Sequence, residues 1–469
     1  MLIFLILMPF LCAFLVFLPI GKKSRLWLLF GVSSIHAVIA GSFWRELPPP
    51  EFSAYLTLDP IGLIFLSVIS FLFLSVSAYM IGYFDNEKRD GRTLVACLLF
   101  LLSTMTLVSV SYHMGLMWVA IETTTLFSAP LISFHRNKQS LEATWKYLLV
   151  CSVGIALALL GTFFLAIAAH DSHTLLLPEL LAGQGSMTIN WLKLSVIFLV
   201  VGYGCKMGLA PTHSWKPEAY GQATGMVVVI MAGALTQCAF LALVRVSQIC
   251  FKTGLYEFYS SILVVTAVLS LIVPAVFMLG ERNVKRLFAY SSVEHMGILV
   301  LGLSLGSAGI FGSLFHMINN ALSKVVMFLT AGSIAQKYGS SRVGDVRGVI
   351  RAYPVTGIFL LFALFGGTGM FPFATFHSEL MILNSAIMSG RYILFVIAII
   401  CLALIFTGLG KVVLEMVYGE PTEPILARKE NFMMNAAIAV SACIMIVLGL
   451  WMPEPLKKML QDAVSMIGA

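Results

Sequence analysis

Charged side chains are scarce in this sequence. Only 11% of its 469 residues are charged, 59% are hydrophobic and the mean hydropathy is +0.96, whereas a soluble domain has about 25% charged residues. A water-soluble fold of this length has too little interior for so many apolar side chains. The composition therefore excludes a soluble protein and indicates one that lies in a membrane.

The cysteines also lack the paired spacing that metal and cofactor sites need. All eight stand singly in apolar runs, without a C-x-x-C pair: Cys12, Cys97, Cys151, Cys205, Cys238, Cys250, Cys401 and Cys443. Iron–sulfur, haem and zinc sites thus lose their support, and we interpret these residues as small buried apolar side chains. We expect no metal site and no cofactor.

Apolar runs of about 18 residues or more recur along the whole sequence, which is the length needed to cross a bilayer. They are continuous and rich in Leu, Ala and Gly, so we expect helices and not the alternating segments of a barrel. The first run lacks a basic segment and a cleavage site, and we read it as a retained helix. The prediction is an all-α membrane protein of about fourteen transmembrane helices in one polytopic domain, residues 1–469.

The basic residues divide unequally between the loops. Odd-numbered loops of the predicted topology hold nineteen: Lys22, Lys23, Arg25, Lys88, Arg89, Arg92, Arg136, Lys138, Lys146, Lys216, Arg282, Lys285, Arg286, Lys337, Arg342, Arg347, Arg351, Arg428 and Lys429. Even-numbered loops hold five: Arg45, Lys193, Arg245, Lys252 and Arg391. Because cytoplasmic loops are enriched in Lys and Arg, this asymmetry puts both termini on the outer side of the cell inner (plasma) membrane. The net charge of +7 is then a topology signal and not a sign of nucleic acid binding.

Two predicted spans are interrupted by glycine and proline. One reads Gly202-Tyr-Gly-Cys-Lys-Met-Gly-Leu-Ala-Pro211 and the other Gly366-Gly-Thr-Gly369-Met-Phe-Pro372-Phe. Such breaks free backbone groups and are typical of transporters built from inverted repeats. The breaks fall in spans 7 and 12, five spans apart. We therefore expect N-terminal helices in residues 1–92, repeats over 93–247 (spans 4–8) and 256–415 (spans 9–13), and a last helix over 430–452.

A few ionisable residues lie inside the predicted spans, where each costs about 2.5–3.5 kcal/mol. They are Glu122, Lys206, Glu294, His295, His316, Lys324, Glu379 and Lys411, with His36 and His113 as weaker candidates. Fixed ion pairs between helices are one explanation. Several such charges in one bundle favour a proton or ion pathway. An ammonium and a carboxylate about 4 Å apart interact by roughly 4 kcal/mol at an effective dielectric near 20, so the opening of a Glu122–Lys206 pair would act as a switch.

The remaining residues of this set suggest a continuation of the pathway. Glu294 and His295 are adjacent and point in different directions from one helix, so we expect at most one of them to face the route. His316 and Lys324 lie two helical turns apart on one face, with Asn320 between them. Glu379 follows the second break by two turns and is a candidate for the last proton acceptor, or for an ordinary solvated helix end.

At these residues the chain resembles the antiporter-like membrane subunits of respiratory complex I, Mrp-type sodium/proton antiporters and membrane-bound hydrogenases. The likeness is greatest to component F of hydrogenase-4 and formate hydrogenlyase complexes. It covers residues from about 55 to 415 and is carried by five tracts: Trp118–Thr125, Ser140–Tyr147, Val201–Trp215, Lys285–Gly297 and His316–Lys324. Lys146 and His213, which lie in these tracts, are further weak candidates.

The resemblance implies fourteen helices with two inverted five-helix repeats and redox-driven translocation of protons or sodium. Glu122, Lys206, the pair His316 and Lys324, and Glu379 match the family's ionisable positions in spans 5, 7, 11 and 12. The sequence departs from the family pattern at Gln237, where many relatives carry lysine, and at Asn320, where they carry a second histidine. A third departure is the segment 223–226, which lacks the usual prolines.

The leading hypothesis is an ion-translocating subunit of a membrane-bound hydrogenase or formate hydrogenlyase complex, with no catalytic site of its own. Its partners would be other membrane subunits and, through them, soluble iron–sulfur and hydrogenase-like or formate-oxidising subunits, together with lipid. A non-pumping scaffold is an alternative that the departures at Gln237 and Asn320 favour. The membrane subunit of an inorganic-carbon uptake system is a third possibility. A stand-alone membrane enzyme is the fourth, and no nucleophile or metal cluster in the sequence supports it.

Overall fold

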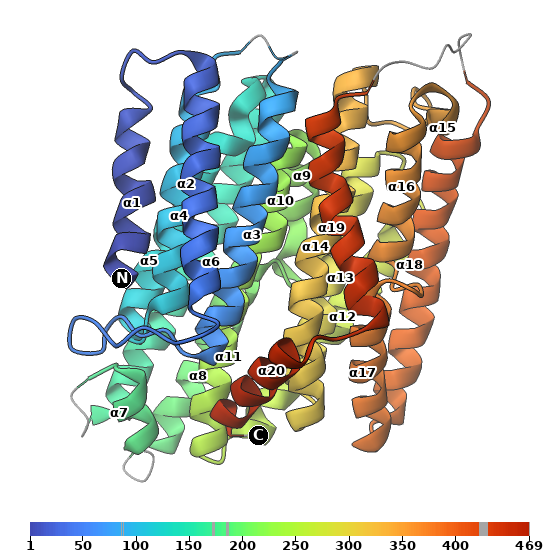
Figure 1. Ribbon diagram of the computed structural model, residues 1–469. Helices are drawn as coiled ribbons and strands as arrows, with labels where there is room; N and C mark the ends of the chain where they lie inside the picture. Colours follow the sequence, from blue (N-terminus) through green and yellow to red (C-terminus); the bar gives the residue numbers. More distant parts are fainter. Residues whose placement is uncertain (86, 88, 171–173, 184–186, 422–429, 469) are drawn as a thin grey trace.

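The computed structural model describes residues 1–85, 87, 89–170, 174–183, 187–421 and 430–468. Within these residues the chain is almost entirely helical, and β-structure is limited to isolated bridges (Figure 1). Three of the basic residues counted in the loops, Lys88, Arg428 and Lys429, lie outside the described residues. The predicted all-helical class is confirmed.

The helices run side by side in one bundle. In the first half of the chain they are α1 (Leu2–Leu15), α2 (Lys22–Ser42), α3 (Pro60–Tyr83), α4 (Arg92–Val110), α5 (Met114–Ile132), the 3-10 turn η1 (Ser133–His135), α6 (Lys138–Ala168), α7 (Leu177–Ala182), α8 (Ile189–Met207), the 3-10 turn η4 (Thr212–Ser214), α9 (Trp215–Gln222), α10 (Gly225–Ile230), the π-helical turn η5 (Met231–Leu235) and α11 (Thr236–Lys252). In the second half they are α12 (Tyr256–Phe277), α13 (Val284–Leu303), α14 (Gly306–Tyr338), α15 (Val349–Ala352), α16 (Pro354–Gly367), α17 (Ala374–Met388), α18 (Tyr392–Tyr418), α19 (Phe432–Leu450) and α20 (Glu454–Ile467).

Eleven helical segments of the described residues are long and apolar enough to cross a membrane. Two shorter apolar helices, α1 and α16, accompany them. The chain is therefore a multi-pass membrane protein. The C-terminal helix α20 differs from the others because it runs obliquely across one end of the bundle (Figure 1). The sequence analysis did not predict it.

Side-chain caps fix where several of these helices begin. Asp59 accepts a hydrogen bond from the Gly62 amide at the start of α3, and Asn283 accepts bonds from two amides at the start of α13. Asn137 and Ser140 form a reciprocal capping box on α6. Such caps satisfy amides that have no partner inside the helix. They place the helix starts at residues that the sequence shows to be polar.

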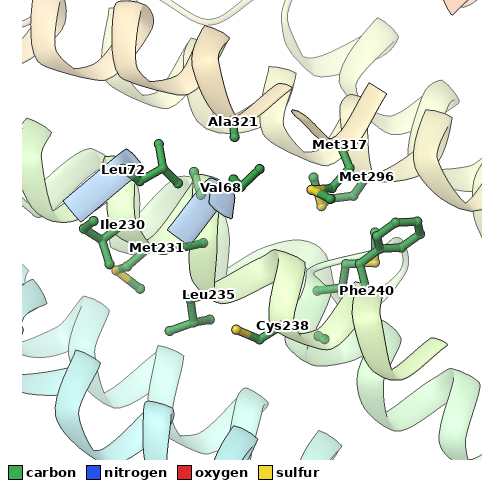
Figure 2. Packing of buried hydrophobic residues seen from close by; sticks show 14 of the residues in the cluster. Val68, Leu72, Ile230, Met231, Leu235, Cys238, Phe240, Met296, Met317 and Ala321 are labelled. Atoms are coloured by element: carbon green, nitrogen blue, oxygen red, sulfur yellow. The ribbon is translucent and has the colours of Figure 1, made fainter. Parts of the chain in front are cut away.

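The segment α10–η5–α11 occupies the centre of the bundle. The most apolar part of this segment is completely buried. It packs against α3 and α14, whose Leu72 and Ala321, labelled in Figure 2, lie next to Gly233. A Cβ atom added to Gly233 would come within 2.9 Å of Leu72. The close approach of α3 thus depends on this glycine, as in other membrane helix interfaces built on small residues.

Four basic residues that were predicted to lie in loops are buried in helices. Lys216 in α9 and Arg245 in α11 are 0% exposed. Arg25 in α2 is 3% exposed, and Lys285 in α13 is 7% exposed. Their assignment to loops was wrong, because each lies one or more residues inside a helix whose apolar neighbours cover it. The loop asymmetry keeps its direction without them, with sixteen basic residues against four.

Candidate functional site

The first predicted interruption separates α8 from α9. The helix α8 ends at Met207, Gly208 adopts a φ of +75°, and the Ala210–Pro211 peptide bond is cis. The Trp215 side chain donates from Nε1 to the Cys205 carbonyl at 3.1 Å, which satisfies a group in the last turn of α8. Lys206 is thereby held in the last turn of a helix that ends inside the protein.

Lys206 is fully buried and is bound by two hydroxyl groups. Its Nζ donates to Thr125 Oγ1 at 2.7 Å and to Tyr147 OH at 3.0 Å. The Tyr147 hydroxyl also forms a hydrogen bond with Ser128 at 2.6 Å. These partners come from α5 and α6, so the first interruption presents its lysine to the neighbouring helix pair.

Glu122 is joined to Lys206 through Thr125 and does not contact it directly. The Thr125 hydroxyl donates to Glu122 Oε2 at 3.2 Å while it accepts the hydrogen bond from Lys206. The sequence analysis expected a direct pair, and this expectation was wrong because a hydroxyl one helical turn from Glu122 lies between the two groups. Glu122 is half-buried, and its α5 neighbours Val119 and Leu126 are 48% and 61% exposed.

The second predicted interruption separates α16 from α17. The helix α16 ends at Gly367, Gly369 has a φ of +61°, and the Phe371–Pro372 peptide bond is cis. The break leaves two carbonyl groups free to accept side-chain hydrogen bonds. Gly366 accepts one from Thr375 at 2.8 Å, and Gly367 forms one with Nε2 of His295 at 3.2 Å.

A chain of hydrogen bonds runs from this break into the bundle. His295 Nδ1 lies 3.0 Å from His316 Nε2, and His316 Nδ1 lies 2.9 Å from the Ser378 hydroxyl. Because the Gly367 carbonyl only accepts, His295 Nε2 carries a proton. In neutral rings His316 then donates to His295 and accepts from Ser378. All three hydrogen bonds of this series therefore point the same way, from Ser378 to Gly367. The series connects α13, α14, α16 and α17.

Lys324 lies on the same face of α14 as His316, as predicted, and both side chains point to α13. Its Nζ is 3.5 Å from Ser291 Oγ, and it interacts electrostatically with Glu294 and Glu379. Glu294 and His295 therefore both face the α14 groups. The expectation that at most one of them would do so was wrong, because α14 packs along α13 closely enough to meet two directions of that helix.

Glu379 lies beside the second break. It is 6% exposed, and a Cβ atom added to Gly369 would come within 2.6 Å of its carboxyl carbon. Glu379 also lines an open, mainly apolar groove of about 400 Å³ between α17 and α18. The residue is thus a buried carboxyl group that lies near the lateral surface of the bundle, on the opposite half of the chain from Glu122.

The two departures from the family pattern are both buried. Gln237 follows the π-helical turn η5 and donates from Nε2 to the Met317 carbonyl at 2.9 Å. Asn320 is 0% exposed, and neither of its amide atoms has a hydrogen-bond partner among the described residues. Asn320 therefore places an uncompensated polar group between His316 and Lys324.

Lys216 and Arg245 are among the buried cations that were not predicted from the sequence. Lys216 donates to the Ser292 carbonyl at 3.3 Å and interacts electrostatically with Lys324. Arg245 binds both carboxylate oxygens of Asp59, at 2.6 and 2.8 Å. Lys216 was detectable, because it lies two residues into the helix that resumes after the first break. The Arg245–Asp59 pair joins residues 186 positions apart and carries no local signal.

The weaker candidates lie away from these clusters. Lys146 is partly exposed and pairs with Glu142 and Glu218. His213 is half-buried in η4, and Lys411 is exposed on α18. His36 bonds to Ser70 and Thr106, and His113 caps α5. Lys146 and Lys411 are thus surface charges, and His36 and His113 form structural hydrogen bonds.

His295, His316 and Glu379 are the set among the described residues best placed to hold a metal ion. Each offers one donor atom, and these atoms lie within 4.8 Å of one another. Two histidines and a carboxylate suit a zinc-type ion. The ring nitrogens are, however, already engaged with each other, with Gly367 and with Ser378. The geometry fits a hydrogen-bonded chain without rearrangement, whereas an ion requires that chain to open.

The comparison with known families places the chain in one of them. The family described as "NADH:quinone oxidoreductase/Mrp antiporter, TM" matches residues 111–406. This chain belongs to that family. The match includes both interruptions and every ionisable residue of the two clusters, so the chain is an antiporter-like membrane subunit related to those of complex I.

Curated relatives agree with this family. The chain is 30% identical to a hydrogenase-4 component F homolog of Methylacidiphilum infernorum, over 81% of each chain. It is 26% identical to NADH-quinone oxidoreductase subunit N of Hydrogenovibrio crunogenus, over 85% of this chain and 82% of the relative. Among solved structures, a chain of an archaeal membrane-bound sulfane sulfur reductase has a TM-score of 0.89 at 20% identity, over 99% of this chain and 97% of that one. This last likeness shows a shared fold.

Proposed function

We propose that this antiporter-like subunit translocates protons, or sodium, within a multisubunit redox complex such as a membrane-bound hydrogenase or formate hydrogenlyase. The observation that carries the proposal is the bridge from Lys206 through Thr125 to Glu122. A buried ammonium linked by a hydroxyl to a half-buried carboxylate supplies a proton donor, a relay and an acceptor in one line. The names of the curated relatives support the redox complex.

The first step is proton exchange across Thr125. The hydroxyl accepts from Lys206 and donates to Glu122, so a proton that leaves the lysine passes to the carboxylate when the hydroxyl hands on its own. The neutral lysine keeps Thr125 and Tyr147 as partners, and the carboxyl becomes neutral as well. Both charges disappear together, which is favourable in a medium of low dielectric constant.

The middle of the route depends on repulsion between buried lysines. Lys216 interacts electrostatically with Lys324. Like charges at short range disfavour one another in a protein interior. A proton taken up by one lysine therefore promotes release from the next. Gln237 and Asn320 do not change charge in this range, and transfer past them would use water.

The last part of the route passes the second break. Lys324 interacts with Glu294 and Glu379, while His316 and His295 connect Ser378 to the carbonyl of Gly367. A proton taken up from Ser378 is held on the two rings as an imidazolium, because the Gly367 carbonyl accepts a hydrogen bond and does not carry a proton onward. Glu379 is the proposed final acceptor, because it lies closest to the lateral groove.

The exposed side of Glu122 is an argument for a neighbouring membrane subunit that covers α5. A carboxylate flanked by exposed apolar residues at mid-helix is costly against lipid, and a partner helix that covers α5 removes that cost. Other membrane subunits, and through them soluble iron–sulfur and hydrogenase-like or formate-oxidising subunits, are the proposed partners. The cell inner membrane is the proposed location, with both termini on its outer side.

The proposed topology has fourteen spans. The eleven long segments are joined by α1, by α13 and by the interrupted pair α16–α17. Residues 93–247 and 256–415 would form inverted repeats that place the two interruptions at equivalent positions. A cis peptide bond before proline in each interruption is a shared local feature.

A non-pumping scaffold is the second candidate function. It is favoured by Gln237, whose amide is committed to the Met317 carbonyl, and by Asn320, which replaces a titratable group of the family. A scaffold would keep the fold and the docking of partners, with no current of ions through the chain.

One experiment separates the two candidates. Glu122→Gln and Lys206→Ala are introduced into the complete complex, and ion translocation is measured in sealed vesicles alongside its assembly. The matched control is Lys411→Ala, which replaces an exposed lysine on α18. The proposal expects assembly in all three and loss of translocation in the first two alone. Normal translocation in both, or an assembled wild-type complex that moves no ions, would favour the scaffold.

A further inference from the structure

A basic cavity lies at the end of the bundle where α3 connects to α4. It has a volume of about 600 Å³ and is lined by Arg89, Arg92 and Arg136, and by apolar Pro130, Leu131 and Phe134. The connection between α1 and α2 lies at the same end (Figure 1). We refer to it as the arginine cavity. It lies outside the proton route described above.

The arginine cavity carries net positive charge. Among the residues that the structure describes, Asp90 is the only acidic one that lines it, and three arginines less one aspartate give a formal charge of +2. Asp90 is already bound by the buried Arg25, which does not line the cavity, and it lies 3.5 Å from Arg92. The charge of Asp90 is therefore compensated mainly by Arg25, which lies outside the cavity. The arginines that line the cavity remain able to bind an anion.

One of the arginines is held in place by its neighbours, and another has no ion-pair partner among the described residues. Arg89 lies over the Phe134 ring at 5.4 Å and donates to the His135 carbonyl at 3.2 Å. Arg136 follows η1 with a φ of +50°, a left-handed conformation that is uncommon for a residue with a side chain. Arg136 is exposed and forms no ion pair with any other residue that the structure describes. Its guanidinium group is free to bind.

The cavity joins charge to apolar surface at the level of a membrane boundary. Pro130, Leu131 and Phe134 belong to the last turn of α5 and to η1, directly beside the arginines. A second cavity of about 420 Å³ is lined by Lys22, Lys23, Trp27, Phe84 and Asp85. Its Phe84 ring contacts the Phe134 ring of the arginine cavity, and Trp27 is 53% exposed. Exposed tryptophan and lysine side chains are typical of the headgroup region of a bilayer.

We propose that the arginine cavity binds the phosphate of an anionic phospholipid. Arginine pairs with phosphate oxygens through two parallel hydrogen bonds, and basic pockets between transmembrane helices suit anionic headgroups. The apolar residues beside the arginines accept the first part of the acyl chains. A free phosphate ion shares the headgroup chemistry but has no use for this apolar surface.

The test measures lipid binding to the full-length chain in mild detergent by native mass spectrometry. The probes are phosphatidylglycerol, phosphatidylcholine and inorganic phosphate. The wild-type chain is expected to retain phosphatidylglycerol in preference to phosphatidylcholine. Inorganic phosphate at the same concentration is expected to leave that lipid bound. Equal retention of the two lipids, or displacement by phosphate, would overturn the proposal.

Two variants locate the binding. Arg136→Gln is expected to weaken phosphatidylglycerol binding roughly 5-fold and Arg92→Gln/Arg136→Gln roughly 30-fold. The control Lys138→Gln/Arg342→Gln removes two exposed charges that do not line the cavity and is expected to bind as the wild type does. The single variant removes no side-chain hydrogen bond or ion pair with the described residues, so it tests the site without a folding defect. Unchanged binding in both cavity variants, or equal weakening in the control, would refute the assignment.

Discussion

The ammonium group of Lys206 donates a hydrogen bond to the hydroxyl of Thr125 at 2.7 Å. The same hydroxyl donates to Glu122 at 3.2 Å, so one small side chain stands between a buried cation and a half-buried carboxylate. Direct ion pairs hold their charges in place. A bridging hydroxyl allows the proton to move while the heavy atoms stay where they are.

Gly369→Ala is expected to disturb Glu379. A left-handed conformation costs a non-glycine residue about 1–2 kcal/mol, and the new Cβ atom would also overlap the carboxyl group of Glu379. We expect lower thermal stability and loss of ion translocation in vesicles of the complex.

Gly390→Ala is the matched control for that substitution. Gly390 also has a positive φ, of +71°, but a Cβ atom there meets nothing within 4 Å. It should lose a similar amount of backbone stability and keep translocation. If the two variants translocate equally well, the contact between Gly369 and Glu379 has no role in the route.

Arg245→Met is expected to destabilise the fold strongly. The arginine is 0% exposed and binds both oxygens of Asp59, and an uncompensated buried charge typically costs about 3–5 kcal/mol. The melting temperature of the purified chain in detergent measures the effect. Asp59→Asn added to this variant should recover part of the loss, because asparagine keeps the cap on α3. A double variant no more stable than Arg245→Met would argue against the buried charge as the cause.

Glu430 is expected to make stability depend on pH in the acid range. Burial raises the pKa of this carboxyl, but hydrogen bonds from Thr356 and Lys337 and the charge of Lys337 outweigh burial, so the pKa lies below its usual value of 4.5. A lowered pKa contributes stability that is present above about pH 4.5 and is lost as the pH falls through the folded-state value.

Melting temperatures of the wild type and of Glu430→Gln across the acid range check this expectation. The wild type should be the more stable protein near neutral pH, and its advantage should shrink as the pH falls below 4.5. A constant difference at all pH values would mean that the charge of Glu430 does not contribute.

The predictions from sequence were most accurate where the cause is local. Glycine and proline at Gly208, Pro211, Gly369 and Pro372 interrupt helices for reasons that lie in a few neighbouring residues. The shared face of His316 and Lys324 follows from helical periodicity alone. Membership of the antiporter-like family was likewise predicted from short tracts around these residues.

What could not be predicted depends on how distant helices meet. Thr125 lies one turn from Glu122, but only the packing of α8 against α5 and α6 brings Lys206 to its hydroxyl. The burial of Arg245 depends on Asp59, which is 186 residues away. The positions of Glu294 and His295 depend on how closely α14 follows α13. Such contacts are set by the whole bundle and leave no pattern within one segment.

Thr125→Val tests the account most directly, because valine keeps the shape of the side chain and removes only the hydroxyl. The measurement is the rate of ion translocation in sealed vesicles of the assembled complex, with Thr125→Ser as the control that restores the hydroxyl. We predict a loss of about 100-fold or more for Thr125→Val and near wild-type rates for Thr125→Ser. Wild-type translocation by the assembled Thr125→Val complex would contradict the claim that the proton passes through Thr125.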